Sequence, residues 1–229
     1  MASRKTSRIV GGAVAWLVIV LMGGVGCARQ DDEGATDGGV ETADTSGGDA
    51  ADAGSTLTWT NDLSRLSGDK AANFVPFTFD YPAHWRVVED GTQPDSESPN
   101  FVKVEHATDD QITIENFAVG WYSGAAAADV MTVLEPQFAG AFPNYQRLGD
   151  QTAAVDGITS SGFLFQARID TASGPVAFYG RALAVPVSAT NGILLIMFAS
   201  DLAEGVEGPE GVGEQGELPV ILESFDIPR

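Results

Sequence analysis

The side chains best suited to acid–base or metal chemistry in this chain are its two histidines, His84 and His106. They lie far apart in the sequence, and neither has a partner at the i, i+4 spacing of a metal-binding helix. A zinc site of the usual ligand count would also have to recruit carboxylates. We therefore assign no metal ligand and no cofactor, and we expect His84 to lie in a turn before Trp85.

A nucleophilic serine is the next candidate for chemistry, because Ser160-Ser161-Gly162 follows Gly157. The spacing differs from that of the G-x-S-x-G turn, which exposes a catalytic serine between a strand and a helix. These serines instead fall in a predicted strand after a hairpin, and no motif marks a Ser/His/Asp triad. We assign no catalytic residue and expect no enzymatic activity.

Acidic residues gather at two places in the second half of the chain. Asp109-Asp110 is typical of a hairpin tip. Residues 201–217 (DLAEGVEGPEGVGEQGE) alternate acids with glycine but lack the Asp-x-Asp-x-Asp-Gly frame of a calcium loop. We interpret this segment as a mobile, solvated loop. A weak cation site or a partner-binding loop is the alternative.

The overall charge excludes one class of partner. Lys and Arg number 12 against 32 Asp and Glu, so the net charge is -20. Such a charge repels phosphate backbones, and we expect no nucleic-acid partner.

With one cysteine in 229 residues, no intramolecular disulfide can form, and the fold must rest on its hydrophobic core.

That cysteine, Cys27, follows a segment typical of protein export. Residues 1–8 are short and basic, residues 9–26 are apolar and uncharged, and small residues lead into the cysteine. These are the three regions of a secretory signal peptide. The apolar run is also close to the ~20 residues of a membrane span, so an uncleaved anchor is the alternative.

A cysteine directly after such a segment resembles the lipobox of bacterial lipoproteins, here Gly24-Val25-Gly26-Cys27. Gly24 stands where that family usually has leucine. The resemblance implies that residues 1–26 are a cleaved signal peptide and that Cys27 carries diacylglycerol and palmitate-type acyl chains. Several such chains would anchor the protein stably to a membrane. Ala28, in place of aspartate after the cysteine, implies the outer membrane if the envelope has two.

Beyond the cysteine, the chain divides into a linker and a domain. Residues 27–56 are dominated by Gly, Ala, Ser, Thr and acids, with almost no large apolar side chain. Such a stretch buries too little apolar surface to offset its ordering entropy, so we predict a disordered acidic linker. Residues 57–229 have the alternation of a folded domain.

The first part of that domain predicts strands followed by a helix. Alternating or β-branched stretches predict strands at residues 77–81, 85–88, 101–104 and 112–122. An apolar residue then recurs every fourth position through residues 124–142, which predicts a helix. Pro136 lies inside this stretch and predicts a kink or two short helices.

The second part predicts an antiparallel meander and a closing helix. Asp156-Gly157 is a hairpin signal between strands at residues 145–155 and 158–169, and Asn191-Gly192 suggests another turn. The run at residues 193–199, ILLIMFA, is apolar on both faces and predicts a central strand. Residues 218–225 predict a short helix. The fold class is therefore α+β, an antiparallel sheet flanked by helices.

Three short segments of this domain form a recognisable set: Phe79-Asp80-Tyr81-Pro82 with Trp85 close behind, Val155-Asp156-Gly157, and Ile221-Leu222-Glu223-Ser224-Phe225. They resemble segments of PsbP-like domains, named for an extrinsic protein of photosystem II. Bacterial DcrB-like lipoproteins and a nuclear-import factor that binds the small GTPase Ran share that fold. The resemblance covers residues 74–227 and implies an α/β/α sandwich with a binding or assembly role. No metal or partner site of the family matches here residue by residue.

Three hypotheses for function remain open from the sequence. The first is a lipid-anchored envelope protein with a non-enzymatic interaction or assembly module and an envelope protein as partner. The second is a carrier of a small apolar ligand, and the third is an esterase-like hydrolase.

Trp85 and Trp121 are expected in the core, whereas Trp59 is expected to be exposed, where it could meet the linker or a partner.

Overall fold

The computed structural model describes residues 54–95, 97–171 and 174–229. The predicted signal peptide, Cys27 and nearly all of the predicted linker lie outside the described residues. Within the described part of the chain, no helix has the length and apolar character needed to cross a membrane.

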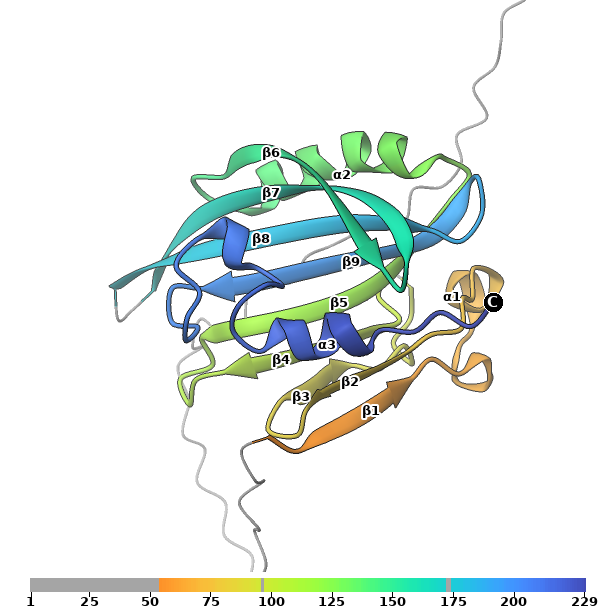
Figure 1. Cartoon of the computed structure of the whole chain (residues 1–229), viewed down its shortest axis with the longest axis horizontal. Helices are drawn as coiled ribbons and strands as arrows, with labels where there is room; N and C mark the ends of the chain where they lie inside the picture. Colours follow the sequence, from red (N-terminus) through yellow and green to blue (C-terminus); the bar gives the residue numbers. More distant parts are fainter. Residues whose placement is uncertain (1–53, 96, 172–173) are drawn as a thin grey trace, which may run out of the picture.

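A seven-stranded antiparallel sheet forms the centre of the domain, and β9 is its middle strand (Figure 1). In spatial order the strands are β3 (Arg86–Glu89), β4 (Val102–Ala107), β5 (Thr113–Ser123), β9 (Asn191–Ser200), β8 (Gly174–Pro186), β7 (Ile158–Thr171) and β6 (Gln146–Val155). Every residue of β9 after Asn191 is buried. The prediction of a central strand covered on both faces is therefore confirmed.

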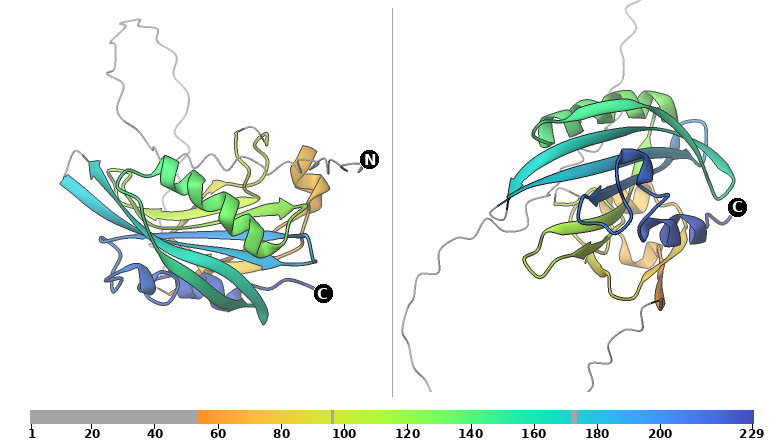
Figure 2. Two further views of the ribbon diagram at one scale, coloured as in Figure 1. Left: turned by 90° about the horizontal axis from the view of Figure 1, so that it is seen from above. Right: turned by 60° about the vertical axis from the view of Figure 1, so that its left-hand side comes forward.

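One face of the sheet is covered by helix α2 (Ala127–Ala141), which lies across β7 and β8 (Figure 2). Its buried residues follow the predicted stripe: Val130, Met131, Leu134 and Phe138. Phe138 packs against the rings of Phe163 and Phe165 from β7. The helix runs as one element through Pro136, so the predicted division into two helices is wrong. Burial of the stripe on both sides of the proline holds the helix together.

The opposite face is covered by a two-stranded ribbon and a short helix. Strand β1 (Thr56–Thr60) pairs with β2 (Thr78–Pro82), and helix α3 (Leu218–Ser224) packs beside β2. The 3₁₀ helix η1 (Leu63–Arg65) and helix α1 (Gly68–Ala72) join β1 to β2. Phe225, just after α3, stacks on Phe77 and Phe79. The α+β fold class is confirmed, although a β-ribbon supplies much of this outer layer.

Two turns of the meander show where local sequence signals succeed and fail. Asp156 and Gly157 both have positive φ and join β6 to β7, as predicted. Asn191 and Gly192, predicted as a turn, already pair within β9. The turn lies just before them, because the backbone N–H groups of Val187 and Ser188 both donate to Asn191 O.

The tryptophan predictions were right for two residues of three. Trp85 and Trp121 are buried in the core beneath the ribbon and α3. Trp59 is also buried in this core, so its predicted exposure is wrong. It lies on β1 opposite Phe79, and the Arg65 guanidinium lies 5.1 Å from its ring centre. Strand β1, which the sequence did not predict, pairs with β2 and thereby carries Trp59 into the core.

Residues 201–217 were predicted to be a mobile, solvated loop, and this is wrong for their apolar side chains. Ala203, Val206 and Val212 are buried in the same core as the ribbon. The segment includes the 3₁₀ helix η2 (Pro209–Gly211), and Arg181 on β8 donates to Val212 O at 3.2 Å. These contacts hold the loop against the sheet, so Glu217 has a fixed position at the start of α3.

Candidate functional site

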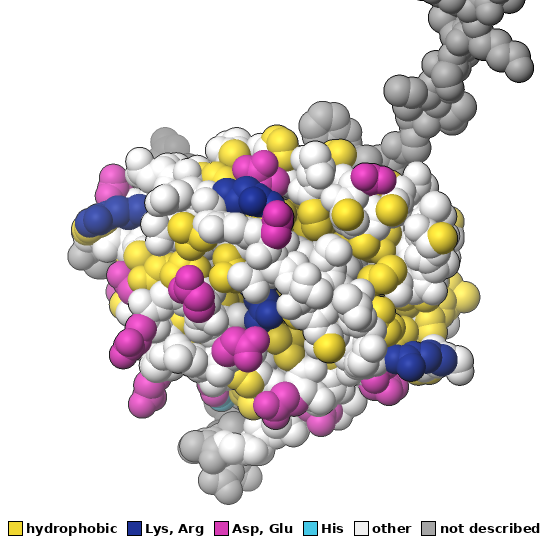
Figure 3. Space-filling view, turned by 45° about the horizontal axis from the view of Figure 1, so that its top comes forward, with side chains coloured by type: hydrophobic (Ala, Val, Ile, Leu, Met, Phe, Trp, Pro, Cys, Tyr) yellow, Lys and Arg dark blue, Asp and Glu magenta, His cyan; other side chains and the backbone are white. Residues whose placement is uncertain are grey.

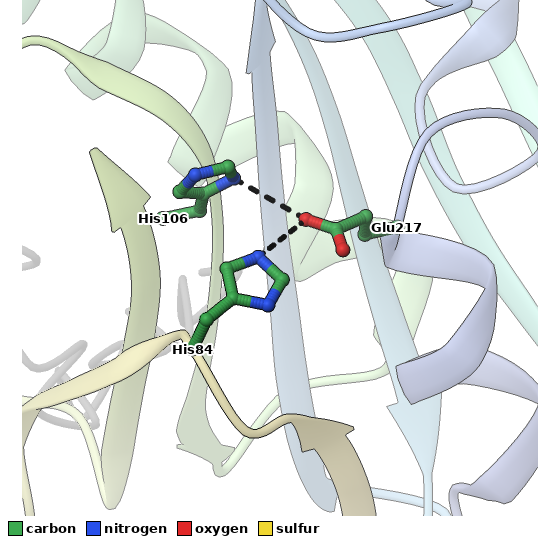
Figure 4. Close-up of side chains that lie close together, drawn as sticks. All are labelled: His84, His106 and Glu217. Atoms are coloured by element: carbon green, nitrogen blue, oxygen red, sulfur yellow. Dashed lines mark hydrogen bonds and ion pairs between the residues drawn. The ribbon is translucent and has the colours of Figure 1, made fainter. Parts of the chain in front are cut away.

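The fold brings the two histidines together at one end of the sheet (Figure 4). His84 lies in the turn between β2 and β3, as predicted, and His106 lies on β4. Their ring centres are 4.7 Å apart and the rings meet edge to face. Sequence spacing gave no sign of this contact, because the two residues come from different elements.

A carboxylate, Glu217, faces both histidines from the start of α3. Its Oε2 lies 3.0 Å from His84 Nε2 and 3.2 Å from His106 Nδ1. The same oxygen accepts a hydrogen bond from Trp85 Nε1 at 2.9 Å. Three side chains of the turn and β4 therefore converge on one oxygen atom, as Figure 4 shows for the two histidines.

Strand register places His106 on the buried side of the sheet's end. Side chains alternate along β4, so His106 shares a face with Val104, a core residue. Directly opposite on β5 is Glu115. His106 thus lies between the core below, Glu115 beside it, and the turn that carries His84.

Glu115 in turn fixes the position of Glu217. The backbone N–H of Glu217 donates to the Glu115 carboxylate, with both oxygens at 3.2 Å. Gly216, just before, has φ +71°, and a β-carbon there would collide with Glu115 Oε1. Glycine is therefore needed at this position both for its backbone conformation and for the close approach of the carboxylate.

Burial shifts the proton affinities of two groups in the site. Glu115 is 2 % exposed, and this burial raises its pKa to about 7, although backbone N–H groups of Glu217 and Leu218 act in the opposite direction. Burial lowers the pKa of His106, and the Glu217 carboxylate opposes that shift. Near neutral pH, Glu115 is therefore divided between its protonated and ionised forms, and His106 favours the neutral form.

The cluster is partly open to solvent. The side chains of His84, His106 and Glu217 are 42 %, 31 % and 36 % exposed. Their nearest ligand atoms, two imidazole nitrogens and a carboxylate oxygen, all lie within 4.8 Å of one another. Among the described residues, these three form the group whose spacing could hold a metal ion.

Among the described residues, the other candidates from the sequence are not members of this cluster. Ser160 is buried on β7, and its hydroxyl donates to Ile158 O. Asp109 and Asp110 form the predicted hairpin tip between β4 and β5. Cys27 lies outside the described residues. The sequence did not identify Glu217, Glu115 or the hydrogen bond of Trp85 as parts of a site. The cation site considered for residues 201–217 was the only indication of it.

A separate pocket of about 400 Å³ lies beside β3 and η1. Trp59 and Val87 contribute apolar surface, whereas Arg65, Asp90 and Gln93 contribute polar groups. Arg65 and Asp90 form an ion pair at 3.0 Å. The mixed lining is unlike the mainly apolar wall of a site for a small apolar ligand.

No family model matches the chain, and no curated protein matches it. Solved structures with similar folds include LpqN, involved in cell envelope biogenesis of Mycobacterium tuberculosis, at 12 % identity and a TM-score of 0.46 over 76 % of this chain and 92 % of LpqN. They also include cyanobacterial PsbP from Synechocystis, at 12 % identity and a TM-score of 0.40 over 81 % of this chain and 99 % of that protein.

Proposed function

We propose that this protein is exported, anchored to a membrane of the cell envelope through a lipid on Cys27, and acts there as a non-enzymatic interaction or assembly module. The observation that carries the proposal is the position of the only cysteine, directly after an apolar export segment and before an acidic linker. A lipid at that point would hold the domain beside the membrane surface while the linker lets it reach a partner.

The partners of the histidines give no support to a nucleophilic mechanism of the serine or cysteine type. Within the described part of the chain, neither histidine forms a hydrogen bond with a hydroxyl or thiol group; the polar contacts of both rings are with Glu217. A nucleophilic mechanism of the serine or cysteine type needs such a group next to its base. The mixed lining of the pocket beside β3 likewise gives no support to a carrier of an apolar ligand.

Charge favours a protein partner over nucleic acid. The net charge of -20 repels phosphate groups. On the face drawn in Figure 3, acidic side chains are spread widely, and the Lys and Arg side chains are few and separated. That face has no continuous basic patch of the kind that binds a phosphate backbone. A partner that meets an acidic surface would be complementary if it were basic.

Replacing Cys27 with serine is expected to abolish lipid attachment, because the cysteine sulfur is the only thiol available for acylation. Metabolic labelling with a palmitate analogue should mark the wild-type protein and not Cys27→Ser. The variant should also remain uncleaved or leave the lipid-anchored pool. Ala28→Ser, which keeps the cysteine, is the matched control and should be labelled. Labelling that persists in Cys27→Ser would contradict the anchor.

We expect the domain to bind an envelope protein and to turn over no substrate. Affinity capture from solubilised membranes should recover this partner when the whole chain is the bait. Residues 1–56 alone should not recover it. The purified protein should leave ester, phosphate, glycoside and peptide substrates unchanged. Turnover that is lost in His84→Ala or His106→Ala, with an unchanged melting temperature, would replace the proposal with a hydrolase.

A further inference from the structure

We propose that His84, His106 and Glu217 form a binding site for a divalent first-row transition-metal cation, with Zn²⁺ as the representative ion. The ion would lie between the β2–β3 turn, β4 and the start of α3. This inference does not rest on the proposed function, since the site belongs to the folded domain and the anchor to Cys27.

The donor set selects the class of cation. Imidazole nitrogens suit zinc, copper, nickel and iron, whereas calcium and magnesium take oxygen ligands. Two imidazoles with one glutamate are also a known set of three protein ligands for zinc, which leaves a fourth position for water or another ligand. His84, His106 and Glu217 supply that set from three separate elements.

The spacing of the donor atoms fits a shared ion. Bonds of about 2.0–2.1 Å to a tetrahedral ion place neighbouring ligand atoms about 3.3 Å apart. Glu217 Oε2 lies 3.0 Å from His84 Nε2 and 3.2 Å from His106 Nδ1. All the ligand atoms lie within 4.8 Å of one another, so a small rotation of the half-exposed His84 ring would complete the set.

An unsatisfied nitrogen is the second observation that points to a ligand. His106 Nδ1 is buried and has no hydrogen-bond partner in good geometry, although it faces Glu217 Oε2. Polar atoms buried in this way usually have a partner, and an exception calls for an explanation. A cation bound by this nitrogen and by Glu217 would supply the missing partner.

The residues around the ligands would hold them in place. Trp85 Nε1 donates to Glu217 Oε2 at 2.9 Å, and Glu115 accepts the backbone N–H of Glu217. Such contacts orient a metal ligand, and their loss typically costs about 10–100-fold in metal affinity. Because the three ligand side chains are partly exposed, water or a partner's side chain could reach an open coordination position of the ion.

The test uses the full-length, metal-free protein titrated with Zn²⁺. We expect one equivalent to bind with high affinity and to raise the melting temperature, because the ion binds the folded state. Since the chain has only two histidines, the ring ¹⁵N signals of both should shift in NMR spectra of the unmodified protein. Ca²⁺ should cause neither effect, which separates the site from loose binding to the acidic linker.

Variants then assign the ligands. His84→Ala, His106→Ala and Glu217→Gln should each weaken Zn²⁺ binding by at least about 100-fold, and Trp85→Phe by about tenfold. Glu223→Gln, which changes an exposed glutamate on α3, should bind like the wild type. Melting curves of the metal-free variants identify any that fail to fold, and the histidine NMR shifts of the unmodified protein remain decisive. Unshifted histidine signals, or equal affinity in the ligand variants and the wild type, would overturn the proposal.

Discussion

Replacing Leu195 with alanine is expected to lower the free energy of unfolding by about 2–5 kcal/mol, the usual cost of truncating a fully buried leucine. Leu195 lies at the middle of β9, the central strand, and has no exposed surface. It pairs with Val119 on β5 and with Leu183 on β8, and both are core residues. With packed neighbours on each side, the surroundings can close the cavity only in part.

Urea unfolding of the purified protein measures this effect. Leu148→Ala is the matched control, since Leu148 lies on β6 of the same sheet but is 40 % exposed. Its truncation should change the unfolding free energy by about 0.5 kcal/mol or less. Equal losses in the two variants would mean that burial in β9 is not what stabilises the domain.

Most of the fold could be predicted because its signals are local. The alternating stretches, the apolar stripe of α2 and the doubly apolar run of β9 each report the environment of one element. Predictions failed where a distant element decides the outcome. Asn191-Gly192 has the composition of a turn, yet pairing with β5 and β8 extends the strand through it. Trp59 precedes the segment that resembles a known family, yet pairing with β2 buries it.

The site could not be predicted, because its geometry depends on register and on contacts between layers. A hairpin tip at Asp109-Asp110 was predicted, but a bulge between His106 and Ala107 shifts the pairing, so that His106 faces Glu115. Glu217 reaches the histidines because α3, which begins just after it, packs beside β2. No local pattern encodes either contact.

Glu115 is expected to make the unfolding free energy fall as pH rises. Its ordinary pKa is 4.5, and burial in the folded protein raises the pKa to about 7. Below pH 4.5 the carboxyl group is protonated in both states, so no penalty arises. Between pH 4.5 and 7 only the unfolded state releases the proton. The free energy of unfolding therefore falls by about 3 kcal/mol over this range, at about 1.4 kcal/mol per pKa unit. Above pH 7 the loss is complete.

Glu115→Gln removes this ionisation and keeps an oxygen that can accept the backbone N–H of Glu217. In EDTA, the variant should therefore be more stable than the wild type by up to about 3 kcal/mol at pH 8, and nearly equal to it at pH 4.5. Other carboxylates, such as Asp62 and Asp90, have lowered pKa values and act in the opposite direction, so the comparison is the difference between the two proteins at each pH. Glu223→Gln on the exposed side of α3 should track the wild type throughout. A difference in unfolding free energy between Glu115→Gln and the wild type that stays constant from pH 4.5 to 8 would contradict this prediction. It would mean that Glu115 has the same pKa in the folded protein as in the unfolded chain, so that burial does not disfavour its charged form.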